Sequence, residues 1–328
     1  MENKQRKGAD FHVDQIQFPD FMNEENMRKM DRQELVNLFL MMGEAMLPGA
    51  ADQPDPLTLP VNGERMEVPT RAGNVRAIFY KAKKAHAPVY FDMHGGGFVG
   101  GNCEDMDFWC VLLRDHLDIN VVSINYRKAP QFPWPTATND AFDTVRWFYD
   151  HAAEFDLDTE KMAIGGHSAG GNLAAVTCLR TLMEDTPYRF RLQVLDYPPL
   201  DLKTCAFDNF THPMAIPPQI AIMFDACYIA PGQGDDPLVS PAVAEVEQLK
   251  GMPPACIVTA ELDSLRDEAE LYGRKLIAAG VPVWSRRFLG SSHGFTMTLG
   301  GRDPLMPEDP NAKIACGMMM DALWYALS

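Results

Sequence analysis

The sequence predicts an α/β protein whose mostly parallel sheet is covered by helices on both faces. Short apolar runs of strand length alternate with helix-like segments through most of the chain. This alternation is typical of crossover connections between parallel strands. A chain of 328 residues, 46% hydrophobic and 23% charged, is long enough for one large domain of this class. No internal repeat is visible, so we expect one domain with an added cap.

The N-terminal part of the chain precedes the predicted sheet. Residues 1–20 are polar and aperiodic, whereas apolar residues recur at helical spacing through residues 21–47. This spacing predicts an amphipathic helix, or a pair of helices, that packs against the main body. Residues 49–60 are rich in proline and form a predicted connector. We therefore expect N-terminal cap helices within residues 1–50 and the main α/β domain over residues 51–328.

Apolar runs bounded by turn residues predict eight strands and the helices between them. The predicted strands are residues 66–70, 75–80, 89–93, 121–125, 161–164, 192–196, 255–259 and 283–288. The predicted helices of the main domain are residues 105–116, 139–155, 172–183, 264–279 and 310–327. An apolar helical segment at residues 207–234 interrupts the alternation, so we expect a cap insertion above the sheet at about residues 203–235.

The charge balance excludes some classes of partner. The formal net charge is −16 and the isoelectric point is near 4.9. Nucleic acids and anionic membrane surfaces require dense lysine and arginine patches, so neither is an expected partner. The basic start of the chain lacks the apolar core of a secretory signal, and no apolar run approaches the length of a membrane span.

The seven cysteines are scattered, odd in number and without C-x-x-C spacing. This usage fits reduced core thiols in a cytoplasmic protein better than a disulfide framework or a zinc site. We therefore expect a cytoplasmic location and no bound metal.

One serine stands in a turn of small residues. Gly166-His167-Ser168-Ala169-Gly170 follows a predicted strand and precedes a predicted helix. In a G-x-S-x-G turn the glycines allow a strand to reverse into a helix with the serine exposed at the apex. The five-residue pattern alone should occur by chance in roughly one chain in ten of this length, so its context has to decide.

That context is a set of polar residues after other strands. Ser168, Asp263 and His293 each follow a predicted strand, where the carboxyl ends of a parallel sheet gather ligands and catalytic groups. Serine needs a base to become a nucleophile, and imidazole is suited to that task at neutral pH. An acid then orients the imidazole and stabilises its cation. The order serine, acid, histidine along the chain is that of α/β-hydrolases.

A glycine run supplies the remaining chemistry. His94-Gly95-Gly96-Gly97-Phe98 follows the strand at residues 89–93. Its backbone N–H groups, together with that of Ala169, can bind the oxyanion of a tetrahedral intermediate. The run fits neither a P-loop nor a dinucleotide-binding fingerprint. No pair of carboxylates suggests glycosidase chemistry.

Several neighbouring residues compete for these roles. Glu261 and Asp267 are alternative acids, although Asp263 is preferred over both. His94 is expected to organise the glycine loop from behind. His167 adjoins the nucleophile in sequence, so its side chain should point away from the hydroxyl and is a poor candidate for the base.

Taken together, these motifs resemble the hormone-sensitive-lipase-like family of α/β-hydrolases, especially bacterial carboxylesterases and acetyl esterases. The resemblance runs from about residue 65 to the C-terminus and rests on the segments at residues 94–98, 125–130, 166–174, 260–268 and 292–295. It implies an eight-stranded sheet, a helical cap made of the N-terminal segment and an insertion after the sixth strand, and no metal or organic cofactor. It also implies a triad of Ser168, Asp263 and His293, with oxyanion donors at Gly96, Gly97 and Ala169.

Two positions depart from the family pattern. His167 stands where the family usually has Asp, and Ser264 stands where Pro often follows the acid. Neither departure removes a catalytic atom. The first is expected to alter the charge beneath the nucleophile or the pH dependence.

The resulting hypothesis is a cytoplasmic serine carboxylesterase that hydrolyses short-chain acyl esters through an acyl-enzyme. An alternative keeps the triad and removes acetyl groups from sugars or amides. An alternative of another class is a non-catalytic small-ligand receptor on the same fold. Relatives often pair through sheet edges or caps, so a homodimer is a further possibility.

Overall fold

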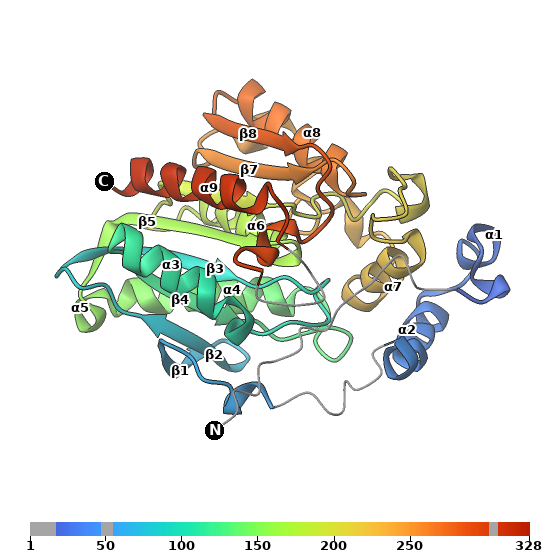
Figure 1. Cartoon of the computed structure of the whole chain (residues 1–328), viewed down its shortest axis with the longest axis horizontal. Helices are drawn as coiled ribbons and strands as arrows, with labels where there is room; N and C mark the ends of the chain where they lie inside the picture. Colours follow the sequence, from blue (N-terminus) through green and yellow to red (C-terminus); the bar gives the residue numbers. More distant parts are fainter. Residues whose placement is uncertain (1–17, 47–54, 302–307) are drawn as a thin grey trace.

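An eight-stranded sheet forms the centre of the computed structural model, which describes residues 18–46, 55–301 and 308–328 (Figure 1). The strand order is β1-β2-β4-β3-β5-β6-β7-β8. β2 pairs antiparallel with β1 and β4, and all other neighbours are parallel. The predicted mostly parallel sheet is thus confirmed. The strands are β1 Glu64–Thr70, β2 Gly73–Tyr80, β3 Ala87–Met93, β4 Asn120–Asn125, β5 Leu157–His167, β6 Leu192–Asp196, β7 Ala255–Ala260 and β8 Val283–Phe288.

Helices cover both faces of the sheet. α3 (Asp107–Leu117) and α9 (Ala312–Leu327) bury their apolar residues against one face. α4 (Thr136–Asp150), α6 (Ala169–Met183) and α8 (Arg266–Ala278) cover the other. Strands enclosed in this way read as continuous apolar runs, and every residue of β3 and of β7 is buried. Six of the seven cysteines are also buried, and all seven are free thiols.

Two helices from distant parts of the chain pack together at one end of the molecule. α2 (Arg32–Met46), which follows the short α1 (Glu24–Met27), lies against α7 (Pro218–Tyr228) (Figure 1). The guanidinium of Arg32 donates to the carbonyls of Ala226 and Ile229 near the end of α7. The predicted helices within residues 21–47 and 207–234 therefore meet. Residues 1–17 and 47–54, which include much of the predicted connector, lie outside the described residues.

Some element boundaries differ from the predicted ones. The helix expected at residues 139–155 is two helices, α4 and α5 (Ala152–Phe155). His151 ends α4, where its imidazole stacks on Trp147 and bonds to the Trp147 carbonyl. Helix α6 begins at Ala169, three residues before the predicted start, because Ser168 itself forms the turn.

Residues 302–307 are a further gap in the description. Short 3-10 helices occupy the connections between the longer elements. They are η2 Asp20–Met22, η4 Pro56–Thr58, η5 Cys103–Met106, η6 Ala206–Asp208, η7 Gln233–Asp235, η8 Pro241–Val243, η9 Val246–Leu249 and η10 Phe295–Thr298. Among the described helices, none combines the length and the apolar composition that crossing a bilayer requires.

A carboxyl group is buried inside the sheet. Asp92 lies on β3 and has no exposed surface. Burial raises the pKa of Asp92 to about 7, although the nearby His167 acts in the opposite direction. The side chain therefore keeps its proton in the folded protein at a pH where the unfolded chain has lost it.

We expect Asp92→Asn to gain stability relative to the wild type as the pH rises. Because the folded pKa is raised, the stability that protonated Asp92 contributes is fully present below the unfolded pKa of about 3.9 and is lost as the pH rises to about 7, by on the order of 4 kcal/mol. Asparagine does not titrate and escapes this loss. Urea unfolding at several pH values measures the difference, and Asp321→Asn, at an exposed position, controls for the lost charge. A pH-independent difference between Asp92→Asn and wild type would contradict the expectation.

Candidate active site

The serine turn lies at the junction of β5 and α6. Ser168 has φ 51° and ψ −122°, a conformation that L-residues rarely adopt. Its N–H donates to the carbonyl of Asp196 at 2.8 Å. Gly166 and Gly170 approach each other and Met93 so closely that a Cβ on either would collide with backbone. The glycines of the motif therefore make this sharp turn possible.

The three residues predicted as a triad meet at this turn. His293 Nε2 lies 2.9 Å from Ser168 Oγ, and His293 Nδ1 lies 2.7 Å from Asp263 Oδ2. Asp263 is fully buried, and its other oxygen accepts from the N–H of Leu265. The sheet order explains the meeting, because β5, β7 and β8 lie within four neighbouring strands and end on the same side.

This geometry allows a proton to pass from the Ser168 hydroxyl to the His293 imidazole. An imidazole that donates from Nδ1 to a carboxylate presents the Nε2 lone pair to the serine hydroxyl. The imidazole can accept the hydroxyl proton when Oγ attacks, and the buried carboxylate stabilises the resulting cation.

The glycine loop after β3 faces the serine turn. A Cβ on Gly95 would lie 3.4 Å from Ser168 Cβ, so the two backbones are in close contact. Gly96 and Gly97 have positive φ values of 121° and 59°. Within the described chain, the N–H groups of Gly96, Gly97 and Ala169 donate no hydrogen bond to protein. Donors of this kind are available to an oxyanion.

His94 supports the loop from behind, as the sequence predicts. Its ring stacks on Tyr126 with centroids 4.2 Å apart, and Nδ1 lies 2.7 Å from the carbonyl of Gly95. Burial, aided by the charge of Lys128, holds the pKa of His94 well below its usual value. The ring is therefore neutral and donates to the loop carbonyl.

The competing acids are engaged elsewhere. Glu261 accepts from the N–H of Gly290, and Asp267 pairs with Arg266 and Arg287. Asp263 is thus the acid that reaches His293. The hydroxyl of Ser264 is buried without a hydrogen-bond partner among the described residues.

His167 points away from the nucleophile, as expected, and contacts a second acid. Its Nδ1 lies 2.8 Å from Asp196 Oδ2, and both side chains are buried. Burial alone would lower the pKa of His167, but the bond to Asp196 and the charge of that carboxylate raise it. The charged imidazolium is therefore favoured beside the carboxylate.

Three residues near the triad were not predicted from the sequence: Asp196, Tyr197 and Thr296. Asp196 Oδ2 also accepts from Thr296 Oγ1, and the ring of Tyr197 packs edge-on against that of His293. The available signal was an aspartate at the end of a predicted strand. Among the described residues, no group of three or more histidine, cysteine, aspartate or glutamate side chains could hold a metal ion.

Comparisons with known proteins identify the family of this fold. A family model described as alpha/beta hydrolase fold matches residues 89–297. An arylesterase from Saccharolobus solfataricus is 32% identical over 234 residues, which are 71% of this chain and 74% of the relative. An ethyl acetate hydrolase from Pseudomonas putida is 30% identical over 76% of this chain and 79% of its own length. A solved esterase structure from Pyrobaculum calidifontis superposes with a TM-score of 0.73 and 29% identity, over 93% of this chain and 97% of that one. The chain therefore belongs to the α/β-hydrolase fold family, within its hormone-sensitive-lipase-like group.

Proposed function

We propose that the protein is a serine carboxylesterase that hydrolyses short-chain acyl esters through an acyl-enzyme, with Ser168, His293 and Asp263 as its catalytic triad. The observation that carries this proposal is the continuous chain of hydrogen bonds from Asp263 Oδ2 through the His293 imidazole to Ser168 Oγ. Named relatives that act as an arylesterase and an ethyl acetate hydrolase support the ester substrate class.

The reaction follows from this geometry. Ser168 Oγ forms a bond to the ester carbonyl carbon while its proton passes to His293 Nε2. The N–H groups of Gly96, Gly97 and Ala169 bind the oxyanion. Collapse of the intermediate breaks the bond to the alcohol, which takes the proton from His293. Water then attacks the acyl carbon while its proton passes to His293. The bond between the acyl carbon and Ser168 Oγ breaks, His293 returns the proton to Oγ, and the acid is released.

Ser168→Ala should abolish hydrolysis of p-nitrophenyl acetate and butyrate. Without the nucleophile, we expect kcat to fall by roughly four orders of magnitude or more. Release of p-nitrophenolate by purified protein measures the loss. Ser264→Ala, which removes a buried hydroxyl beside Asp263, should leave kcat unchanged.

Two further measurements separate the alternatives. A fluorophosphonate should label the wild type at Ser168, whereas a non-catalytic receptor would remain unlabelled. Faster acetate release from acetylated xylo-oligosaccharides than from simple esters would favour the deacetylase over the carboxylesterase. Unchanged p-nitrophenyl ester hydrolysis by Ser168→Ala would refute the proposed nucleophile.

We also propose that residues 1–50 and an insertion at about 203–235 form a cap over the catalytic domain of residues 51–328. The support is aromatic packing over the glycine loop. The ring of Phe224 on α7 lies so close to Gly97 that a Cβ there would collide with it. The ring of Phe39 on α2 packs edge-on against the ring of Phe224, with ring centroids 5.9 Å apart. Rings in this position restrict the space beside the oxyanion donors, which supports a preference for short acyl chains.

Phe224→Ala should shift the acyl-chain preference toward longer esters. Removing the ring opens space beside Gly97, so kcat/KM for octanoate should rise relative to acetate, by about tenfold for the apolar area gained. A p-nitrophenyl ester series from acetate to decanoate measures the change. Phe21→Ala, at an exposed position of η2, should keep the wild-type preference. An unaltered preference in Phe224→Ala would contradict the placement of the acyl site.

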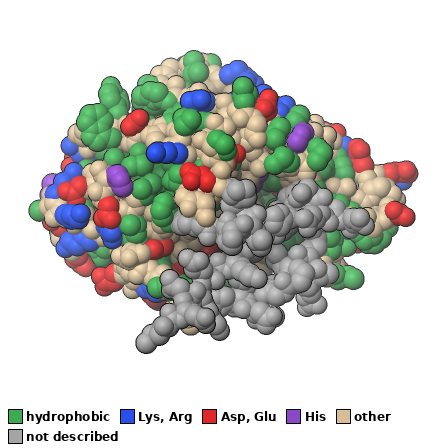
Figure 2. Space-filling model, in the orientation of Figure 1, with side chains coloured by type: hydrophobic (Ala, Val, Ile, Leu, Met, Phe, Trp, Pro, Cys, Tyr) green, Lys and Arg blue, Asp and Glu red, His purple; other side chains and the backbone are tan. Residues whose placement is uncertain are grey.

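We further propose a cytoplasmic homodimer that forms at the β8 edge of the sheet. The free thiols support the location. β8 is the last strand in the sheet order, so its outer edge pairs with no described strand. Trp284 on β8 and Trp324 and Tyr325 on α9 are 40%, 62% and 69% exposed. Hydrophobic side chains gather over α9 and β8 in Figure 2, and exposed apolar patches mark association surfaces.

The double variant Trp324→Glu, Tyr325→Glu should convert a dimer into a monomer, because each subunit would bury two charges at the interface. Sedimentation velocity measures the assembly state of both proteins. Met183→Glu, at an exposed apolar position on α6, should remain a dimer. A monomeric wild type, or a dimeric double variant, would rule out this interface.

A further inference from the structure

Asp196 holds the segments on both sides of the proposed catalytic pair. It ends β6, which lies between β5, the strand before Ser168, and β7, the strand before Asp263, and it has no exposed surface. Its carbonyl accepts from the N–H of Ser168 at 2.8 Å. Its carboxylate Oδ2 lies 2.8 Å from His167 Nδ1 and 2.5 Å from Thr296 Oγ1. His167 precedes Ser168, and Thr296 lies three residues after His293.

The contact with His167 explains how a charge is held in this interior. A buried carboxylate is costly unless it is paired and hydrogen-bonded. The imidazole of His167 supplies a charge-assisted bond, and the hydroxyl of Thr296 supplies a second one. The pair is therefore a second His–Asp unit, separate from the triad.

The contact with Thr296 extends this unit to the other side of the site. Because the Thr296 hydroxyl donates to Asp196, the hydroxyl of Tyr197 donates to Thr296 Oγ1 at 2.9 Å. The ring of Tyr197 packs against the ring of His293 with centroids 4.8 Å apart. Tyr197 also has a positive φ of 39°, which is rare for a bulky residue and persists where surrounding contacts impose it.

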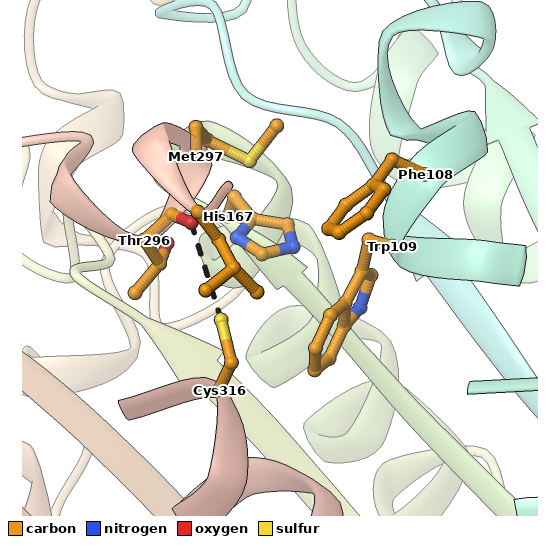
Figure 3. A pocket seen from close by; sticks show the side chains of 7 residues that line it. Phe108, Trp109, His167, Thr296, Met297 and Cys316 are labelled. Carbon is orange, nitrogen blue, oxygen red and sulfur yellow. Dashed lines mark hydrogen bonds between the residues drawn. The ribbon is translucent and has the colours of Figure 1, made fainter. Parts of the chain in front are cut away.

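The network is closed to solvent. Figure 3 shows the imidazole of His167 between Thr296 and Met297 on one side and Phe108 and Trp109 on the other. The cavity among these residues has a volume of only about 10 Å³, roughly that of one water molecule. A substrate therefore has no access to His167, and the role of the pair must be exerted through neighbouring residues.

We propose that Asp196 is a positioning residue that, through His167 on one side and Thr296 and Tyr197 on the other, aligns the Ser168 hydroxyl with the His293 imidazole. The inference rests on the proposed function, because alignment of Ser168 with His293 affects a rate only if these two residues act as nucleophile and base. His167, the residue that departs from the family pattern, is thus the hydrogen-bond partner of the Asp196 carboxylate.

Thr296→Val tests the link, because valine keeps the shape and removes both hydrogen bonds of the hydroxyl. We expect kcat for p-nitrophenyl acetate to fall by about ten- to a hundred-fold, as a small misplacement of reacting groups does, with KM unchanged. Thr296→Ser keeps the hydroxyl and should restore most of kcat. The rate at which a fluorophosphonate labels Ser168 should fall in parallel in Thr296→Val.

Thr298→Val is the matched control, since Thr298 lies on the same turn and bonds to Phe295 and Asp309 instead. It should keep the wild-type kcat even if its melting temperature falls. The proposal is overturned if folded Thr296→Val keeps the wild-type kcat, or if Thr296→Ser loses as much as Thr296→Val. If Thr296→Val does not fold, Tyr197→Phe keeps the ring on His293 and removes only the hydroxyl, and a wild-type kcat there overturns the proposal. A wild type that neither hydrolyses esters nor reacts with the fluorophosphonate would instead refute the proposed function.

Discussion

The backbone of Ser168 is the constraint on which the site depends. Its positive φ places the side chain at the apex of a reversal between β5 and α6, where the hydroxyl is accessible to an imidazole from another loop. Such a conformation persists only when the surroundings impose it. Here the close approach of Gly166 and Gly170 and the bond from the Ser168 N–H to Asp196 supply that support. The packing and hydrogen bonds of the sheet thus offset the backbone strain at Ser168.

The sheet converts distant positions of the chain into neighbours. Ser168, Asp263 and His293 are far apart in sequence, yet they follow strands β5, β7 and β8, whose carboxyl ends lie along the same edge of the sheet. The glycine loop joins them because β3 lies next to β5 in the sheet. Polar groups collected in this way lie at the edge of an apolar core, where a buried carboxylate such as Asp263 interacts strongly with the imidazole.

Much of this arrangement could be predicted from the sequence. Alternating apolar runs located all eight strands, and the order of Ser168, Asp263 and His293 identified the residues that the structure brings together. The contacts of Asp196, Thr296 and Tyr197 could not be predicted, because they depend on how side chains from three segments orient in three dimensions. The packing of Phe224 over Gly97 is of the same kind. The break at His151 could not be predicted either, because the apolar spacing continues past the residue at which α4 ends.

A covalent acyl group on Ser168 tests the proposed mechanism most directly. Rapid mixing of the wild type with p-nitrophenyl pivalate, whose hindered acyl group slows deacylation, should give a burst of p-nitrophenolate equal to the enzyme concentration. Acid quenching and peptide mass mapping should then locate the acyl group on the peptide that contains Ser168. Turnover without a burst and without an adduct, or an adduct on a different residue, would contradict nucleophilic catalysis by this serine.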